Sequence, residues 1–286
     1  MSTNNTSKLV LLGTGGGPTP KRERNANCNA IVAGDATYII DAGNGIARQL
    51  AFADIAFNSI RSVGITHHHS DHNADAGTLL HLAWCANLTR PVQTFGPAPW
   101  SSMWDSFLSY AQRDTSIRIV DEGRPDFAAL VSARDITDDG TDPGVVYEDD
   151  RVRISAAWVN HPPIDALAYR VDCEDKSYVI SGDTTPCDAL VELAQGADVL
   201  VHEVMHVPSI EPLLARSNGE TLRDHLIASH TASTDVGEVA ARAGVKKLVL
   251  SHFVPSSPAV PDDVWLADAR RGYDGPVVVG QDLMEM

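Results

Sequence analysis

The chain has 286 residues, of which 43% are hydrophobic and 21% charged, the composition of a folded globular protein rather than a disordered one. We expect one domain over residues 1–286, because α/β folds often run to about 250 residues as a single unit. The formal charge of −16 makes nucleic acid an unlikely partner, since phosphate binding usually shows as a basic face.

Cysteine spacing and apolar runs favour a soluble protein of the cytoplasm. The four cysteines are widely spread with no CxxC pair, which is typical of thiols in a reducing compartment. The N-terminal apolar run is short and is interpreted as a first strand, not a signal peptide. No apolar run approaches the roughly 18 residues of a membrane span.

Predicted elements of the first half alternate strands with helices. Short apolar runs bounded by turn residues predict strands over 8–13, 28–34, 36–43, 59–66 and 91–97. Helical periodicity predicts helices over 44–55, 75–88 and 99–113. Residues 120–144 are polar and rich in turn signals, and the segment at about 98–150 is interpreted as a helical lid or insert.

The second half repeats this rhythm. Strands are predicted over 152–161, 167–172, 177–183, 199–204, 247–253 and 276–281, with helices over 186–197 and 234–244. Strand runs followed by a helix thus occur twice, which predicts two similar halves packed through their sheets. The expected fold class is α/β, a four-layer αββα sandwich.

The segment "GITHHHSDHNAD" at 64–75 concentrates ionisable side chains directly after a buried strand. His67, His69 and His72 lie close together in sequence with Asp71 between them. Imidazole and carboxylate in this pattern suit zinc, iron or manganese. A polar surface turn is the alternative, but turn chemistry rarely supplies three such histidines.

Further ionisable residues end later apolar runs. They are His161, Asp183, the pair His202 and Glu203, and His252. Open α/β sheets place ligand sites at the carboxyl ends of their strands. These positions therefore predict one shared site with the histidine cluster.

The sequence resembles the metallo-β-lactamase superfamily, whose HxHxDH signature is present at 67–72. The resemblance implies two divalent metal ions, zinc first with manganese or iron as alternatives. It assigns His67, His69 and His161 to one metal, Asp71, His72 and His252 to the second, and Asp183 to a bridge between them. It also implies a hydroxide activated by both metals, with Asp71 as ligand and proton acceptor.

A narrower likeness is to ribonuclease Z and its small-molecule relatives. It rests on the Gly/Pro loop after the first strand, on "VHEV", and on "SHTASTDVGEVAARAGVKKLVLSHF". By this likeness Glu203 and His230 would form a pair near the leaving group. The tRNA-binding arm of ribonuclease Z would lie between His161 and Asp183, where residues 162–182 leave room for two strands and a turn only. With the acidic charge, the missing arm makes tRNA an unlikely substrate.

The preferred hypothesis is a dinuclear metal-dependent hydrolase of a small ester, with phosphodiesters ahead of aryl sulfates and lactones. An apolar stripe of Trp100, Met103, Trp104 and Phe107 is a candidate substrate wall, with core packing as its alternative. The competing functions are a tRNA 3′-processing endoribonuclease, an iron-dependent oxidoreductase and a silent binding protein. A homodimer is expected by analogy with the family.

Overall fold

The computed structural model describes residues 6–215, 219–256 and 259–286. The strands are β1 Lys8–Gly13, β2 Cys28–Ala33, β3 Ala36–Ala42, β4 Ile60–Gly64, β5 Val92–Pro97, β6 Val131–Ile136, β7 Gly144–Glu148, β8 Val152–Val159, β9 Ala166–Cys173, β10 Ser177–Ile180, β11 Val199–Met205, β12 Leu248–Val254, β13 Val277–Val279 and β14 Met284–Glu285. The helices are α1 Ile46–Phe52, α2 Ser70–Asn73, α3 Ala76–Cys85, α4 Trp100–Glu122, α5 Phe127–Leu130, α6 Asp188–Leu193, α7 Glu211–Leu214, α8 Gly219–Ser229, α9 Val236–Ala243 and α10 Asp262–Ala269. Two 3₁₀ turns lie at Phe57–Ser59 and Val207–Ser209.

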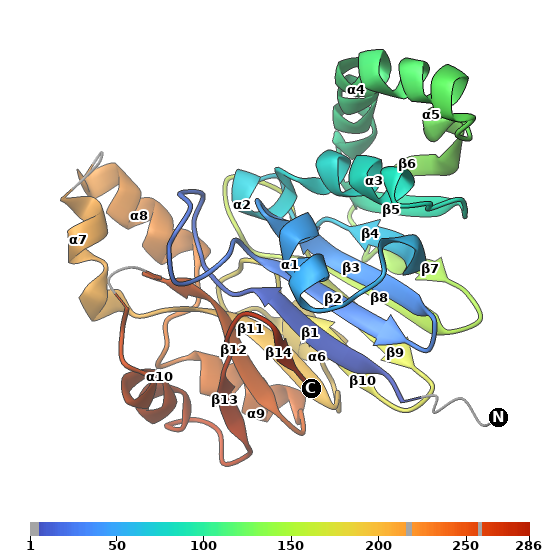
Figure 1. Cartoon of the computed structure of the whole chain (residues 1–286). Coiled ribbons are helices and arrows are strands. Elements are labelled where there is room, and N and C mark those ends of the chain that lie inside the picture. The colour runs from blue at the N-terminus through green and yellow to red at the C-terminus, as the bar shows by residue number, and fades with distance from the viewer. Residues whose placement is uncertain (1–5, 216–218, 257–258) are drawn as a thin grey trace.

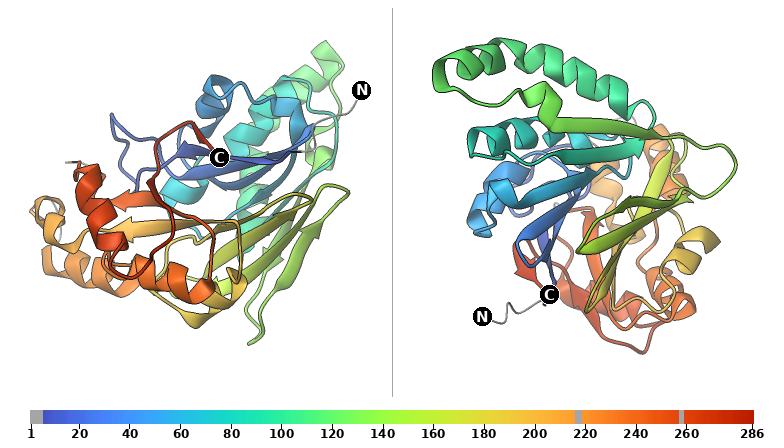
Figure 2. Two further views of the ribbon diagram at one scale, coloured as in Figure 1. Left: turned by 90° about the horizontal axis from the view of Figure 1, so that it is seen from below. Right: turned by 90° about the vertical axis from the view of Figure 1, so that its right-hand side faces the viewer.

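Two seven-stranded sheets face each other, with helices on both outer faces (Figures 1 and 2). The first sheet has the order β14-β1-β2-β3-β4-β5-β6 and the second β13-β12-β11-β10-β9-β8-β7. In each sheet, antiparallel strands lead into parallel ones: β3 to β6 run parallel, as do β10 to β13. The predicted αββα sandwich is confirmed.

The period-two alternation of strand side chains divides the core into layers. In β1, Leu9 and Leu11 lie between the two sheets, whereas Val10 packs toward the helices outside the first sheet. A third apolar cluster fills the space between the second sheet and helices α6, α9 and α10. Each sheet is therefore buried on both faces, which holds its strand ends in fixed positions.

The segment over 98–150 contains more regular structure than the sequence predicts. Helix α4 continues to Glu122, nine residues past its predicted end at 113, and the predicted polar stretch contains α5 and β6. Strand β6 forms the edge of the first sheet, and β7 forms the edge of the second. The segment is thus woven into the sandwich, and its role as a lid stays a prediction.

Helices α7, α8 and α10 were also not predicted. Helix α8 has a mixed sequence, GETLRDHLIAS, and with α7 it contributes Leu214 and Leu226 to a small apolar cluster with Met205 and Val254. Within the described residues, no helix combines the length and the apolar character that crossing a bilayer requires.

Candidate metal centre

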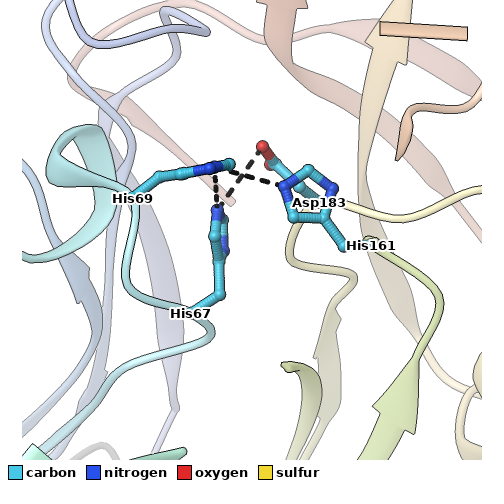
Figure 3. Close-up of side chains that lie close together, drawn as sticks. All are labelled: His67, His69, His161 and Asp183. Carbon is cyan, nitrogen blue, oxygen red and sulfur yellow. Dashed lines mark hydrogen bonds and ion pairs between the residues drawn. The ribbon is translucent and has the colours of Figure 1, made fainter. Parts of the chain in front are cut away.

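The first group of predicted ligands converges from both sheets (Figure 3). His67 and His69 follow β4, whereas His161 follows β8 and Asp183 follows β10. His69 Nδ1 lies 3.1 Å from His67 Nε2 and 3.2 Å from His161 Nε2. One ligand atom from each of the four residues lies within 4.8 Å of the others.

The second group shares Asp183 with the first. His252 Nε2, at the end of β12, lies 3.3 Å from both Asp71 Oδ2 and Asp183 Oδ2. His72 Nε2 lies 3.4 Å from Asp183 Oδ1, the other oxygen of that carboxylate. Asp183 therefore lies between the two groups, where the predicted bridging ligand would be.

Hydrogen bonds hold the ring nitrogens of His161 and His72 that face away from the cluster. His161 Nδ1 donates to the carbonyl of Ser229 over 2.8 Å, and His72 Nδ1 lies 2.8 Å from Asp41 Oδ2. Such bonds fix the tautomer and leave the second nitrogen free to bind a metal. His252 itself has φ of +43°, a backbone region that non-glycine residues rarely adopt, so its ring is aimed by a strained backbone.

Unpaired buried atoms and neutral imidazoles show that these residues fit a pair of metal ions. His72 Nε2 and Asp183 Oδ1 are buried without a hydrogen-bond partner among the described residues, an expensive arrangement that a cation between them would relieve. Burial lowers the pKa of His67 well below its ordinary value and, with the nearby His161, lowers the pKa of His69 to about 4. Both rings are thus neutral at physiological pH, as metal binding requires.

Three carboxylates create a strongly negative potential around His72. Burial alone would lower the pKa of His72, but Asp183, Asp41 and Asp71 outweigh it and raise the value well above the ordinary one. A buried site that stabilises a positive charge so strongly also attracts a divalent cation. Zinc, manganese and iron all accept this mixture of imidazole and carboxylate.

Glu203 and His230 form a buried pair beside the cluster. His230 Nδ1 lies 3.2 Å from Glu203 Oε1, which also accepts hydrogen bonds from the backbone N–H groups of Thr184 and Thr231. Burial lowers the pKa of His230, but the Glu203 carboxylate outweighs it and raises the pKa to about 9. His230 therefore carries a proton at neutral pH, 3.9 Å from Asp183 Oδ2.

Two residues at the site were missed in the sequence. Asp41 ends the apolar strand β3, so the strand-end rule that marked the other residues would have found it. His225 places its ring centroid 5.9 Å from that of His69 and 6.0 Å from that of His161. It has no motif context in the sequence.

His202 was grouped with the strand-end residues, yet its Nδ1 bonds to the backbone carbonyl of Glu203 and it joins none of the ligand groups.

The proposed substrate wall is largely core. Trp100 and Trp104 are each 3% exposed and belong to the apolar cluster over the first sheet, and Trp100 Nε1 donates to Thr94 Oγ1. Phe107 packs on the same cluster, while Met103 is 37% exposed. This placement argues against substrate contact by the two indoles, and contact by Met103 or Phe107 stays a prediction.

Fold and site together define a class of protein. An αββα sandwich that joins histidines and carboxylates from both sheets into adjoining ligand groups is the framework of a metal-dependent hydrolase. The profile of the metallo-β-lactamase superfamily matches residues 22–252. The chain belongs to this superfamily.

Known relatives place it more narrowly. Ribonuclease Z of Mycobacterium marinum is 31% identical over 280 residues, which cover 96% of each chain. Among solved structures, the metallo-β-lactamase fold protein YhfI from Bacillus subtilis has a TM-score of 0.70 at 19% identity and covers 98% of this chain and 99% of its own. Human tRNase Z, short form, has a TM-score of 0.68 at 18% identity, with 98% of each chain covered. At these identities the two structures show the shared fold.

Proposed function

We propose that this protein is a phosphodiesterase that cleaves RNA, with tRNA precursors as its substrate class. The observation that carries the proposal is the protonated His230 held by Glu203 beside the metal ligands. Cleavage of an RNA phosphodiester releases a ribose alkoxide, which is a poor leaving group unless it receives a proton. Aryl sulfates and aryl esters release stable anions and need no such acid, so the pair supports an alkyl phosphodiester.

The metal ligands, Asp71 and the pair of His230 and Glu203 have separate roles in the proposed reaction. The two ligand groups would hold two divalent metals, which would supply charge neutralisation and an activated water. Asp71 is ionised at neutral pH, because His72 and His252 outweigh burial and lower its pKa, and it can accept a proton from the attacking water. His230 donates its proton to the departing oxygen, and Glu203 keeps it charged and oriented.

The expectation that nucleic acid is an unlikely partner needs correction. It rested partly on the absence of an arm between His161 and Asp183. The relative called ribonuclease Z aligns over 280 residues with 96% of each chain covered, which leaves no room for a long arm that it has and this chain lacks. The missing arm therefore does not separate this chain from that relative.

Basic residues near the centre also support an RNA substrate despite the acidic net charge. The loop after β1 carries Lys21, Arg22 and Arg24, and its Gly16 N–H donates to the carbonyl of Phe253, next to His252. Arg24 lies 4.1 Å from the ring centroid of Phe253, and Arg22 is exposed. Positive charge in a loop that packs against the strand end carrying His252 supports binding of phosphate groups there.

A small phosphodiester is the second candidate. The net charge of −16 favours it, because a long RNA would meet repulsion beyond the basic loop. Aryl sulfates and lactones remain further substrates to test.

The test compares a tRNA precursor carrying a 3′ trailer with an aryl phosphodiester, an aryl sulfate and an aryl lactone. We expect trailer removal that is lost on chelation. His230→Ala should slow RNA cleavage by about 100- to 10,000-fold while hydrolysis of the aryl diester falls much less, because its leaving group needs no proton. Turnover of small diesters without RNA cleavage would favour the second candidate, and inactivity toward every substrate would overturn both.

A further inference from the structure

A third group of metal-type side chains lies apart from the centre, between helices α3 and α4. It consists of His81 and Cys85 on α3 and Asp114 on α4, and one ligand atom from each lies within 4.8 Å of the others. Helix α4 lies over α3 on the outer side of the first sheet (Figure 1). None of these residues belongs to the ligand groups at the strand ends.

The spacing is suited to binding one ion. Residues four positions apart on a helix lie on the same face, so His81 and Cys85 present their donor atoms side by side. Asp114 approaches from the neighbouring helix, with its Oδ2 2.9 Å from His81 Nε2. An imidazole nitrogen, a thiol and a carboxylate are all zinc ligands.

Packing fixes the orientation of the His81 ring. Its centroid lies 5.5 Å from that of Phe127 and 5.8 Å from that of Trp84, and the side chain is 19% exposed. Its Nε2 is buried and lies close to Asp114, but makes no well-directed hydrogen bond within the described part of the chain. His81 therefore has a buried nitrogen close to two further atoms that can bind a metal, Cys85 Sγ and an Asp114 oxygen.

Arg118 is the group that a metal would have to displace. Its Nε donates to Asp114 Oδ2 over 2.9 Å, while its Nη1 donates to Glu122 Oε1 over 2.6 Å. Glu122 can therefore keep Arg118 when Asp114 turns to an ion. A thiolate from Cys85 and the carboxylate of Asp114 would balance the charge of a divalent cation, so binding leaves the site neutral.

We propose that His81, Cys85 and Asp114 form a separate zinc site that fastens α4 to α3. Three protein ligands hold the ion and solvent completes the tetrahedron, since Cys85 and Asp114 are both partly exposed. Because its ligands come from both helices, a bound ion would cross-link α3 and α4, although the position left to solvent differs from the closed four-ligand sites of most structural zinc ions.

Cobalt provides a specific test, because the ligands at the strand ends are nitrogen and oxygen only. A thiolate bound to cobalt gives a near-ultraviolet charge-transfer band that those ligands do not produce. We expect the band in the cobalt-loaded protein and its loss in Cys85→Ser, with one fewer zinc ion bound per chain. Cys173→Ser, a change at another half-buried free cysteine, is the matched control and should keep the band.

A second readout covers the case in which a variant folds poorly. His81→Gln should weaken the band. It should also reduce the rise in melting temperature that zinc gives the parent protein, leaving only the part that comes from the ligands at the strand ends. Absence of the band in the cobalt-loaded parent, or an unchanged band and zinc content in Cys85→Ser, would overturn the site.

Discussion

Asp41 Oδ2 lies 2.8 Å from His72 Nδ1, and neither side chain has any surface exposed to solvent. The same carboxylate accepts hydrogen bonds from the backbone N–H and the hydroxyl of Thr66, over 2.8 and 2.9 Å, and from Asn27 Nδ2. Asp41 has φ of +65°, so the chain adopts an unfavourable backbone to place it. This carboxylate links the end of β3 to the first metal-binding turn.

Asp41→Asn should lower zinc affinity by about 10- to 100-fold, because the ring of His72 loses the charge that orients it and makes it a stronger ligand. Competition titration against a zinc chelator measures this change. Asp35→Asn, at a carboxylate that is 59% exposed, is the control and should bind as the parent does. Equal affinities for the two variants would contradict the role given to Asp41.

The Glu203 carboxylate should set the alkaline limit of RNA cleavage. His230 acts in its protonated form, so the rate should fall as pH rises through its pKa, which the Glu203 carboxylate raises above the ordinary value. Glu203→Gln keeps an oxygen for the N–H groups of Thr184 and Thr231 but removes the charge, which should move this limb to lower pH. Profiles of kcat/KM against pH measure the shift, and an aryl diester, which needs no acid, should lack it. A limb that stays in place would exclude Glu203 from this role.

Removing the metals should destabilise the fold as well as abolish activity. The ligands come from both sheets, so an ion binds the native state and not the unfolded chain. At a free metal concentration about 1,000 times Kd, one such site stabilises by about 4 kcal/mol. Calorimetry with and without a chelator should show a clear fall in Tm. A Tm that chelation leaves unchanged would mean that the ligand groups hold no metal.

Asp149 should contribute to stability in a pH-dependent manner. Its carboxylate accepts hydrogen bonds from Tyr38 Oη and Tyr147 Oη, over 2.8 and 2.9 Å. Burial would raise its pKa, but these bonds and those from the backbone of residues 151 and 152 lower it. The stabilisation is therefore complete above the unfolded pKa of about 3.9 and is lost as pH falls through the lower folded value.

Asp149→Ala should cost about 1–3 kcal/mol at neutral pH, because two partly buried hydroxyls lose their acceptor. Urea unfolding at neutral and acidic pH measures the cost and its disappearance in acid. Asp150→Ala removes an adjacent carboxylate that is 68% exposed, and as a surface ion pair it should cost less than about 1 kcal/mol. Similar losses in the two variants would refute the proposed network.

The metal ligands could be predicted from the sequence because they stand at strand ends. Half-exposed elements such as β6 could not be predicted. The ligands stand directly after apolar runs, and the sheets must bring such ends to one edge. Strand β6, by contrast, alternates poorly because it is an edge: Arg134 reaches the Val146 carbonyl, and Asp135 accepts from Ser101. Their charges obscured a strand in the sequence.

Long-range contacts decided the remaining positions. His225 reaches the centre only because α8 packs through Leu226 onto residues at the ends of β11 and β12. Nothing in the local sequence of α8 encodes that packing. The orientation of His202 away from the ligands follows from strand alternation, since Glu203 on the same strand points toward them.

The division of the two sheets between the two halves of the chain makes the protein separable in principle. A break in the exposed loop between β6 and β7 would leave two fragments, each with a nearly complete sheet. The first would keep the histidines of the HxHxDH motif, and the second would keep His161, Asp183 and His252. Neither fragment alone holds all the ligands of either group at the strand ends, so metal binding there would favour association of the two fragments. Reassembly could be followed as the return of catalysis.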